Sequence, residues 1–332
     1  MNRLPRFTLW ISLAIAAALC VAGLRLMLTP TIPVVSAAVT GVQDQAPPDQ
    51  GQDPAAVNMA PSGPSYTTEA PPPEQAGGAP GPDDQDYAEQ PTETATQPPP
   101  PLPDYTQPPS PGDGYMWTPG YWAWGPAGYY WVPGAWVEAP YMGALWTPGY
   151  WGFYGGRYLF YPGHWGLHIG FYGGINYGFG YLGFGYEGGY WNSGRFFYNR
   201  VYNHINERVV HNVYEFRAPV HGYSAPRGNY DQHNNNAPRG NYDSHASFRG
   251  GPGGIQSHPQ PSEGAAWHEP TAPRMSTQVQ HAQTYQSNRG QFANANHGRP
   301  TTPAVSRPVP ADHNVTPTVR AQNHSTDNGG HR

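Results

Sequence analysis

The sequence has 332 residues, enough for two domains, but 42 of them are glycine and 41 proline, a content at the edge of the low-complexity range. All 17 basic residues are arginine, and a chain without lysine cannot form a Walker A phosphate loop, a Schiff base or a serine–lysine catalytic pair. A net charge of −5 argues against nucleic-acid binding through a strong positive field, and a single cysteine, Cys20, excludes a disulfide framework and a CxxC redox site.

A hydrophobic segment near the N-terminus predicts export. Arg3 and Arg6 precede the apolar run 9–24, and small residues typical of a processing site follow at 35–38. The run is longer than a typical signal-peptide core and shorter than a membrane-spanning helix, so two alternatives stay open. We expect residues 1–38 to form an apolar helix that is a signal peptide cleaved after Ala37 or Ala38, or an uncleaved inner-membrane anchor through residues 9–28. In both cases the rest of the chain is exported.

The next stretch, residues 39–114, is rich in proline and acidic residues. Residues 41–114 hold 19 prolines and 12 carboxylates with no arginine. Proline runs favour extended polyproline II conformation, and repulsion among the carboxylates extends the chain further. We therefore expect a disordered spacer, either one that holds the following region away from a membrane or wall, or a linker without a selected length.

A tryptophan-containing repeat begins at residue 115. Units of the form W-x-P-G-x-W occupy 117–122, 131–136 and 146–151, and a fourth unit at 160–165 begins with phenylalanine. The second tryptophans, Trp122, Trp136, Trp151 and Trp165, recur every 14 or 15 residues. Four units in register indicate a structural repeat.

The chemistry of each unit predicts an all-β, antiparallel meander over residues 115–169. Proline followed by glycine favours a type II turn, which would place Trp117 opposite Trp122 on adjacent strands. Two-residue hairpins prefer primed turns, so wider loops around the Pro-Gly pairs are an alternative. The expected strands lie near 115–118, 121–124, 129–132, 135–138, 144–147, 150–153 and 157–161.

Alternation along these strands gathers most of the tryptophans on one face. The aromatic stripe has two interpretations: a core covered by the following tract, which is the usual role of such a stripe, or an exposed platform that stacks on sugar rings or aromatic-rich polymers. The candidate binding residues of this face are Trp117, Trp122, Trp124, Trp131, Trp136, Trp146, Trp151 and Trp165.

The W-x-P-G-x-W units resemble the YXWGXW (or WXXGXW) repeat proteins of bacteria. Residues 188–200, 206, 212–214, 247–255, 291–293 and 296–300 are similar to the segments that follow the repeats in that family, so the resemblance covers about 115–300. It implies a secreted or envelope-associated bacterial protein, and it carries over no catalytic residue.

Glycine alternates with tyrosine and phenylalanine in residues 170–198. This tract would supply flexible aromatic groups for self-association or cover the tryptophan face. The GxGxxG matches at 178–183 and 183–188 lack the preceding strand, following helix and downstream acid of a dinucleotide site. Residues 199–217 should form a short ordered segment, for which apolar residues every four positions suit a helix while β-branched residues and asparagines argue for strand or coil.

Residues 218–332 are rich in asparagine, glutamine, histidine and arginine, and we expect a disordered tail with one helix near 275–292. Histidines are scattered through it, and His204, Glu207 and His211 do not have the spacing of a zinc-binding helix. The sequence therefore predicts no metal site and no cofactor.

Together these features predict a non-enzymatic, exported structural or interaction protein of the bacterial cell envelope. Its aromatic repeats would self-associate or contact a surface polymer such as polysaccharide or peptidoglycan. The alternative is a carbohydrate- or peptidoglycan-binding module on an exposed Trp/Tyr face. The membrane would be contacted only through an uncleaved N-terminal segment, and no specific nucleic-acid partner is expected.

Overall fold

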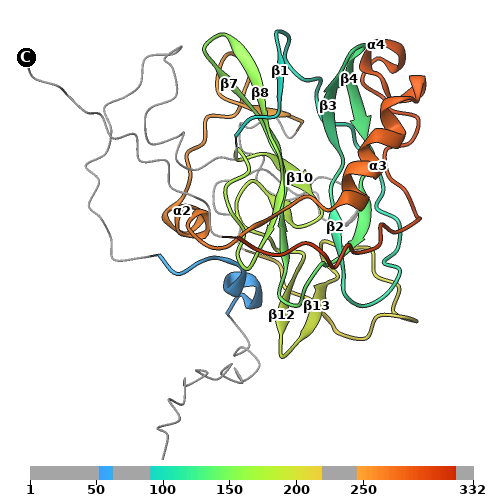
Figure 1. Ribbon diagram of the computed structural model, residues 1–332. Coiled ribbons are helices and arrows are strands. Elements are labelled where there is room, and N and C mark those ends of the chain that lie inside the picture. Colours follow the sequence, from blue (N-terminus) through green and yellow to red (C-terminus); the bar gives the residue numbers. More distant parts are fainter. Residues whose placement is uncertain (1–51, 63–89, 219–244, 319–332) are drawn as a thin grey trace, which may run out of the picture. The chain divides into compact units, whose positions relative to one another are not determined.

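The computed structural model describes residues 52–62, 90–218 and 245–318 (Figure 1). The chain divides into two compact units, 1–43 and 44–332, and every described residue belongs to the second. The predicted signal peptide or anchor and its apolar helix lie outside the described residues, as do 63–89, 219–244 and 319–332. Among the described helices, none has the length and hydrophobicity that crossing a membrane requires.

The first two repeat units form a long β-hairpin that is bent in both arms, called here the first hairpin module (residues 115–138). Its outer strands, β2 (Tyr115–Thr118) and β5 (Ala135–Glu138), pair with each other, and so do its inner strands, β3 (Tyr121–Gly125) and β4 (Gly128–Val132). Because Thr118 faces Ala135 and Tyr121 faces Val132, the two Pro-Gly pairs lie opposite each other at the bend.

The third and fourth units repeat this arrangement in the second hairpin module (residues 145–166). Its outer strands are β6 (Leu145–Thr147) and β9 (His164–Gly166), and its inner strands are β7 (Tyr150–Tyr154) and β8 (Arg157–Tyr161). Thr147 faces His164 and Tyr150 faces Tyr161, so Pro-Gly pairs again face each other across the bend.

The seven predicted strands thus form and β9 adds an eighth, but the predicted type II hairpin turns at Pro-Gly are wrong. Trp117 lies opposite Trp136 rather than Trp122, and none of the Pro-Gly glycines of the four repeat units has a positive φ. The chain reverses instead at Pro126-Ala127 and at Gly155-Gly156, where the two glycines have φ of 56° and 78°. The fold class is therefore mostly β with several small, chiefly antiparallel sheets, in place of one continuous meander.

Short strands from outside the repeats extend the second module. β1 (Glu93–Ala95) pairs with β8, and β15 (Phe248–Arg249) pairs in parallel with β7, giving the sheet order β1-β8-β7-β15. β16 (Ala272–Pro273) pairs with β9. Residues on both sides of the repeats therefore complete its sheets.

The glycine–tyrosine tract packs against the hairpin modules, which agrees with the covering role considered for it. It contains β10 (Asn176–Gly178), β11 (Tyr181–Leu182), β12 (Gly189–Asn192) and β13 (Arg195–Asn199), and β14 (Val213–Tyr214) pairs with β13. Tyr172, Tyr181 and Tyr198 are fully buried. Residues 199–217 contain turns and a strand, with no helix.

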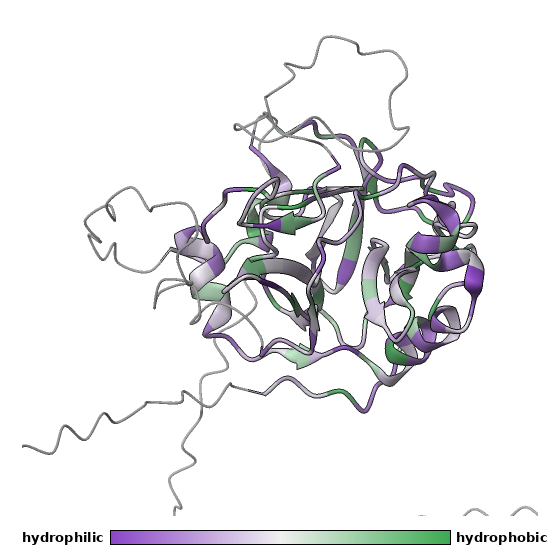
Figure 2. Ribbon diagram, turned by 90° about the horizontal axis from the view of Figure 1, so that it is seen from above, coloured by the Kyte–Doolittle hydropathy of each residue, from purple (hydrophilic) through white to green (hydrophobic). Residues whose placement is uncertain are grey.

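Much of the predicted spacer and tail is ordered. Residues 52–62 and 90–114, expected to be part of a disordered spacer, include the 3-10 helix η1 (Pro54–Asn58) and β1. Residues 245–318, expected to be disordered apart from one helix, include α2 (Pro261–Trp267), α3 (Ser276–Gln286), η2 (Arg289–Gln291) and α4 (Ala293–Asn296). α3 falls inside the predicted helix at 275–292 and packs on β4 (Figure 1). Its one buried residue is Ala282, and the helices carry mainly hydrophilic residues (Figure 2).

Candidate interaction site

Aromatic pairs cross each hairpin module. In the first module the ring centroids of Trp117 and Trp136 are 5.5 Å apart and those of Trp122 and Trp131 are 5.2 Å apart. In the second, Trp146 and Trp165 are 5.1 Å apart, and Trp151 and Phe160 are 5.2 Å apart. The first aromatic residue of one unit therefore packs on the second tryptophan of the other, and each edge-on or tilted pair adds to the energy of area burial.

The glycines of the Pro-Gly pairs make this packing feasible. A Cβ atom at Gly120 would lie 2.3 Å from Cζ2 of Trp131, and one at Gly134 would lie 2.6 Å from Cζ2 of Trp117 and 3.0 Å from the backbone N of Gly120. The second module repeats the contact, with 2.5 Å between a Cβ at Gly163 and Cζ2 of Trp146. Each module therefore needs glycine at the bend because the two bent arms and an indole ring meet there.

The eight tryptophans proposed as a binding face lie in the interior. Seven are buried, with exposed fractions of 5% or less, and Trp124 is half-buried against Tyr129, at a centroid distance of 4.7 Å. Of the two interpretations of the stripe, the core agrees with this burial. An exposed stacking platform would require the folded chain to open.

Extended proline-rich chain covers the first hairpin module. The indole N–H of Trp122 donates to the carbonyl of Pro101 at 3.2 Å, and that of Trp136 donates to the carbonyl of Pro108 at 2.8 Å. Both carbonyls belong to residues 96–111, called here the proline-rich segment. A third indole, that of Trp131, donates to the carbonyl of Pro303 at 2.9 Å. Prolyl carbonyls suit this role because extended polyproline chain leaves them without internal partners.

Apolar side chains anchor the proline-rich segment between these hydrogen bonds. Leu102 and Tyr105 are buried, with exposed fractions of 3% and 8%. The hydroxyl of Tyr105 accepts a hydrogen bond from the backbone N–H of Gly120 at 3.0 Å. Its ring lies 5.1 Å from that of Phe179 and 6.0 Å from that of Trp131. The segment is thus part of the core.

Residues outside the repeats hold the remainder of the segment. The side-chain amide of Gln107 donates to Oδ1 of Asn203 at 3.0 Å, and its oxygen accepts from the backbone N–H of His204 at 2.6 Å. The backbone N–H of Leu102 donates to the carbonyl of His245 at 2.8 Å. The segment therefore docks on a surface assembled from three parts of the chain.

A second extended stretch runs alongside β5. The N–H of Gly134 donates to the carbonyl of Pro303 at 3.1 Å, and the N–H of Val309 donates to the carbonyl of Trp136 at 2.8 Å. Glu138 N–H returns a bond to the carbonyl of Val309 at 3.0 Å. Two proline-containing segments that are far apart in sequence thus form hydrogen bonds with the same short hairpin.

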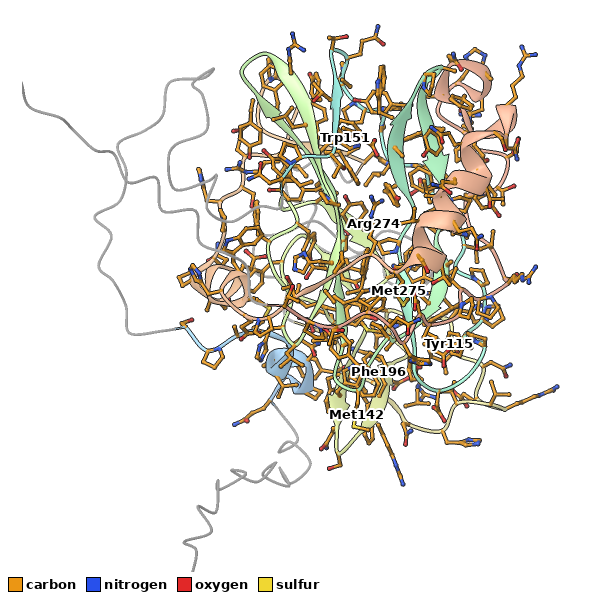
Figure 3. The ribbon with its side chains drawn as sticks, in the orientation of Figure 1. Tyr115, Met142, Trp151, Phe196, Arg274 and Met275 are labelled. Carbon is orange, nitrogen blue, oxygen red and sulfur yellow. The ribbon has the colours of Figure 1, made fainter. Side chains whose placement is uncertain are left out.

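A polar cluster lies between the modules. Arg274, next to the start of α3 (Figure 3), donates to the Tyr121 hydroxyl at 3.2 Å. Burial raises the pKa of the Glu93 carboxyl, while the N–H of Trp124, at 2.6 Å, and the charge of Arg274 lower it. A cavity of about 30 Å³ beside Arg274 lies at the Pro-Gly bends, lined by Pro119, Pro148, Gly149, Gly163 and other residues. It has room for one or two water molecules and not for a sugar ring.

Other carboxylates lie apart from this cluster. Burial, with the neighbouring Asp53, raises the pKa of Glu187 to about 8, and Oε2 of Glu187 has no hydrogen-bond partner among the described residues. Burial likewise raises the pKa of Glu263 to about 8. Glu138 lies elsewhere and accepts from the N–H of Ala311 at 3.1 Å. Within the described ranges, histidines and carboxylates form no group of three or more that could hold a metal ion.

A family model described as "WXXGXW repeat" matches residues 112–137 with two copies. The chain therefore contains WXXGXW repeats, as the sequence resemblance predicted, and the matched residues coincide with the first hairpin module. No curated protein and no solved structure matches this chain.

Sequence reasoning located the tryptophans but missed the segments that cover them. The available signal was the position of proline runs 98–101 and 108–109 directly before the first repeat, and of Pro300, Pro303 and Pro308 near the C-terminus. Read by composition alone, both stretches predicted disorder.

Proposed function

We propose that this chain is an exported, non-enzymatic structural protein of the bacterial cell envelope whose WXXGXW hairpins serve as a scaffold for extended, proline-rich chain. The observation that carries the proposal is the donation of three indole N–H groups of one hairpin to the carbonyls of Pro101, Pro108 and Pro303. Indoles that donate to prolyl carbonyls from an aromatic surface are a recurring means of polyproline recognition. Export is supported by the basic, apolar N-terminal sequence and by the family resemblance.

The scaffold role is tested by hydrogen exchange on the full chain. Leu102 is buried, and Leu102→Asp would place a charge against the aromatic core, which is unfavourable by several kcal/mol. We expect the amides of Leu102 and Ser110 to be protected in the wild type and to lose protection in L102D. Pro109 in the same segment is exposed, and Pro109→Ala is the matched control that should keep protection. Unprotected wild-type amides at these positions would refute the scaffold role.

Export and polymer contact need separate measurements. Cell fractionation with N-terminal sequencing should find the protein in the envelope or outside the cell, beginning after Ala37 or Ala38 if the segment is cleaved, or at the original N-terminus if it is an anchor. A cytoplasmic protein would refute export. Titration with peptidoglycan fragments should leave the fluorescence of the buried tryptophans unchanged. A saturable change would favour the carbohydrate- or peptidoglycan-binding alternative over the scaffold.

A further inference from the structure

The proline-rich segment is connected to the first hairpin module by a short glycine-containing hinge. Gly112, Asp113 and Gly114 separate the segment from β2, and Gly114 has φ of 79°. A Cβ atom at Gly112 or Gly114 would meet nothing within 4 Å. This linker is therefore unpacked on its side-chain side, and its glycines can change backbone conformation at low steric cost.

Few hydrogen bonds hold the hinge in its present conformation. The hydroxyl of Tyr198 accepts from the N–H of Tyr115 at 3.1 Å and lies 2.9 Å from the carbonyl of Tyr115 and 3.2 Å from that of Gly112. Because the hydroxyl has a single proton, it donates a hydrogen bond to only one of these two carbonyls at a time. The N–H of Ala139 donates to the carbonyl of Gly114 at 3.0 Å. The Tyr198 hydroxyl is thus the principal side-chain group that fixes the hinge.

The contacts of the segment are made with residues beyond the hinge. The hydrogen bond from Trp122 to Pro101 spans 21 residues, that from Trp136 to Pro108 spans 28, and that from Gln107 to Asn203 spans 96. β1, just before the segment, likewise pairs with β8. A second copy of the chain presents the same receiving surface, so a segment that swings out at the hinge recovers each of these contacts on a neighbouring copy.

We propose that residues 90–111 exchange between two copies of the chain, so that the proline-rich segment of each copy docks on the first hairpin module of the other. The arrangement is closed and two-fold symmetric, because each copy gives one segment and receives one. Its contacts are those of the closed chain, so the balance between the two forms depends on hinge strain and on the entropy of association. The inference rests on the scaffold role proposed above, since it needs the same docking surface.

Cross-linking between differently marked copies tests the exchange. Pro109 and Glu207 are both exposed, and they neighbour a hydrogen bond in which the N–H of Asn206 donates to Oγ of Ser110 at 3.0 Å. In a Cys20→Ser background, full chains carrying Pro109→Cys are mixed with full chains carrying Glu207→Cys, incubated to allow exchange, and treated with a short bifunctional maleimide. A P109C/E207C double variant at high dilution measures docking within one chain.

Exchange predicts that the mixture gives a cross-linked dimer in higher yield than either variant by itself. It also predicts that the protein without cross-linker has twice the mass of one chain in solution. Tyr198→Phe should raise the fraction of chains whose proline-rich segment is undocked by about fivefold, which corresponds to the loss of one hydrogen bond. The initial rate of dimer formation should rise by the same factor. If the double variant forms an intrachain cross-link while the mixture gives no cross-linked dimer, exchange is refuted and the scaffold role stands. Equal yields from the single variants would also refute it, because they indicate non-specific contact. If the double variant forms a cross-link neither within one chain nor between two chains, both proposals fall.

Discussion

The glycine at the bend of each hairpin module gives the sharpest test of how the repeat folds. Gly120→Ala would place a methyl carbon 2.3 Å from Cζ2 and 2.7 Å from Cε2 of Trp131, and 2.9 Å from the carbonyl oxygen of Val132. Unstrained carbon–carbon contacts lie at about 3.5–4.0 Å, so the ring or the strand must move by roughly 1 Å. Trp131 is fully buried, packs on Trp122 and donates to the carbonyl of Pro303, which opposes such a movement.

Overpacking of this kind typically costs about 1–3 kcal/mol, and the rigid neighbours place Gly120→Ala near about 3 kcal/mol. For a folded unit of this size, that loss lowers Tm by roughly 6–12 °C. Urea and thermal unfolding followed by tryptophan fluorescence measure both quantities. Gly112→Ala is the matched control, since its methyl would meet nothing within 4 Å, and it should change stability by less than about 0.5 kcal/mol. A G120A protein as stable as G112A would refute the steric role of the repeat glycine.

Two further predictions concern buried polar groups. Trp117 and Trp136 are both fully buried, but the indole N–H of Trp136 donates to Pro108 while that of Trp117 has no hydrogen-bond partner among the described residues. Trp136→Phe should therefore destabilise the protein by about 1–2 kcal/mol more than Trp117→Phe in urea unfolding, and equal losses would contradict the assigned bond. The second concerns pH: burial raises the pKa of Glu187 and Glu263 from 4.5 to about 8, so the folded chain keeps protons that the unfolded chain releases. The free energy of unfolding should then fall as pH rises from 4.5 to 8, by at most about 1.4 kcal/mol per pH unit for each carboxyl, and a Glu187→Gln, Glu263→Gln double variant should flatten this slope. An unchanged slope would show that other groups cause it.

The positions of seven repeat strands could be predicted from the sequence almost to the residue, whereas β9 and the strands outside the repeats were not predicted. The expected strands at 115–118, 135–138 and 157–161 coincide with β2, β5 and β8, and the others differ by one residue at an end. Proline and glycine interrupt the alternating pattern at short intervals, and this signal is local to each unit. Strand positions of this kind need no knowledge of the partner strand.

The pairing of the strands could not be predicted in the same way. A Pro-Gly pair considered by itself favours a type II turn, and that local preference led to Trp117 being placed opposite Trp122. Glycine is required at Gly120 for another reason, the approach of Trp131 from the other arm of the hairpin. That contact belongs to a residue 11 positions further along the chain, so no property of the isolated unit reveals it. Because two units pair with each other, the first aromatic residue of one unit faces the second aromatic residue of the other.

The burial of the tryptophan face depends on segments that composition assigned to disorder. A proline-rich stretch buries little apolar area by folding on itself, which is why composition predicts disorder for residues 96–111. Beside a tryptophan-rich hairpin, ordering of the same stretch is more favourable in free energy. Its backbone is already restricted, so docking loses less conformational entropy, and its carbonyls lack internal donors. A short hairpin that carries Trp122, Trp131 and Trp136 has unsatisfied donors and exposed aromatic surface instead, because its own strands cannot cover its indole N–H groups and ring faces. Each part supplies what the other lacks, so the predicted disorder of residues 96–111 was wrong because it was inferred from that stretch considered without the hairpin that it covers.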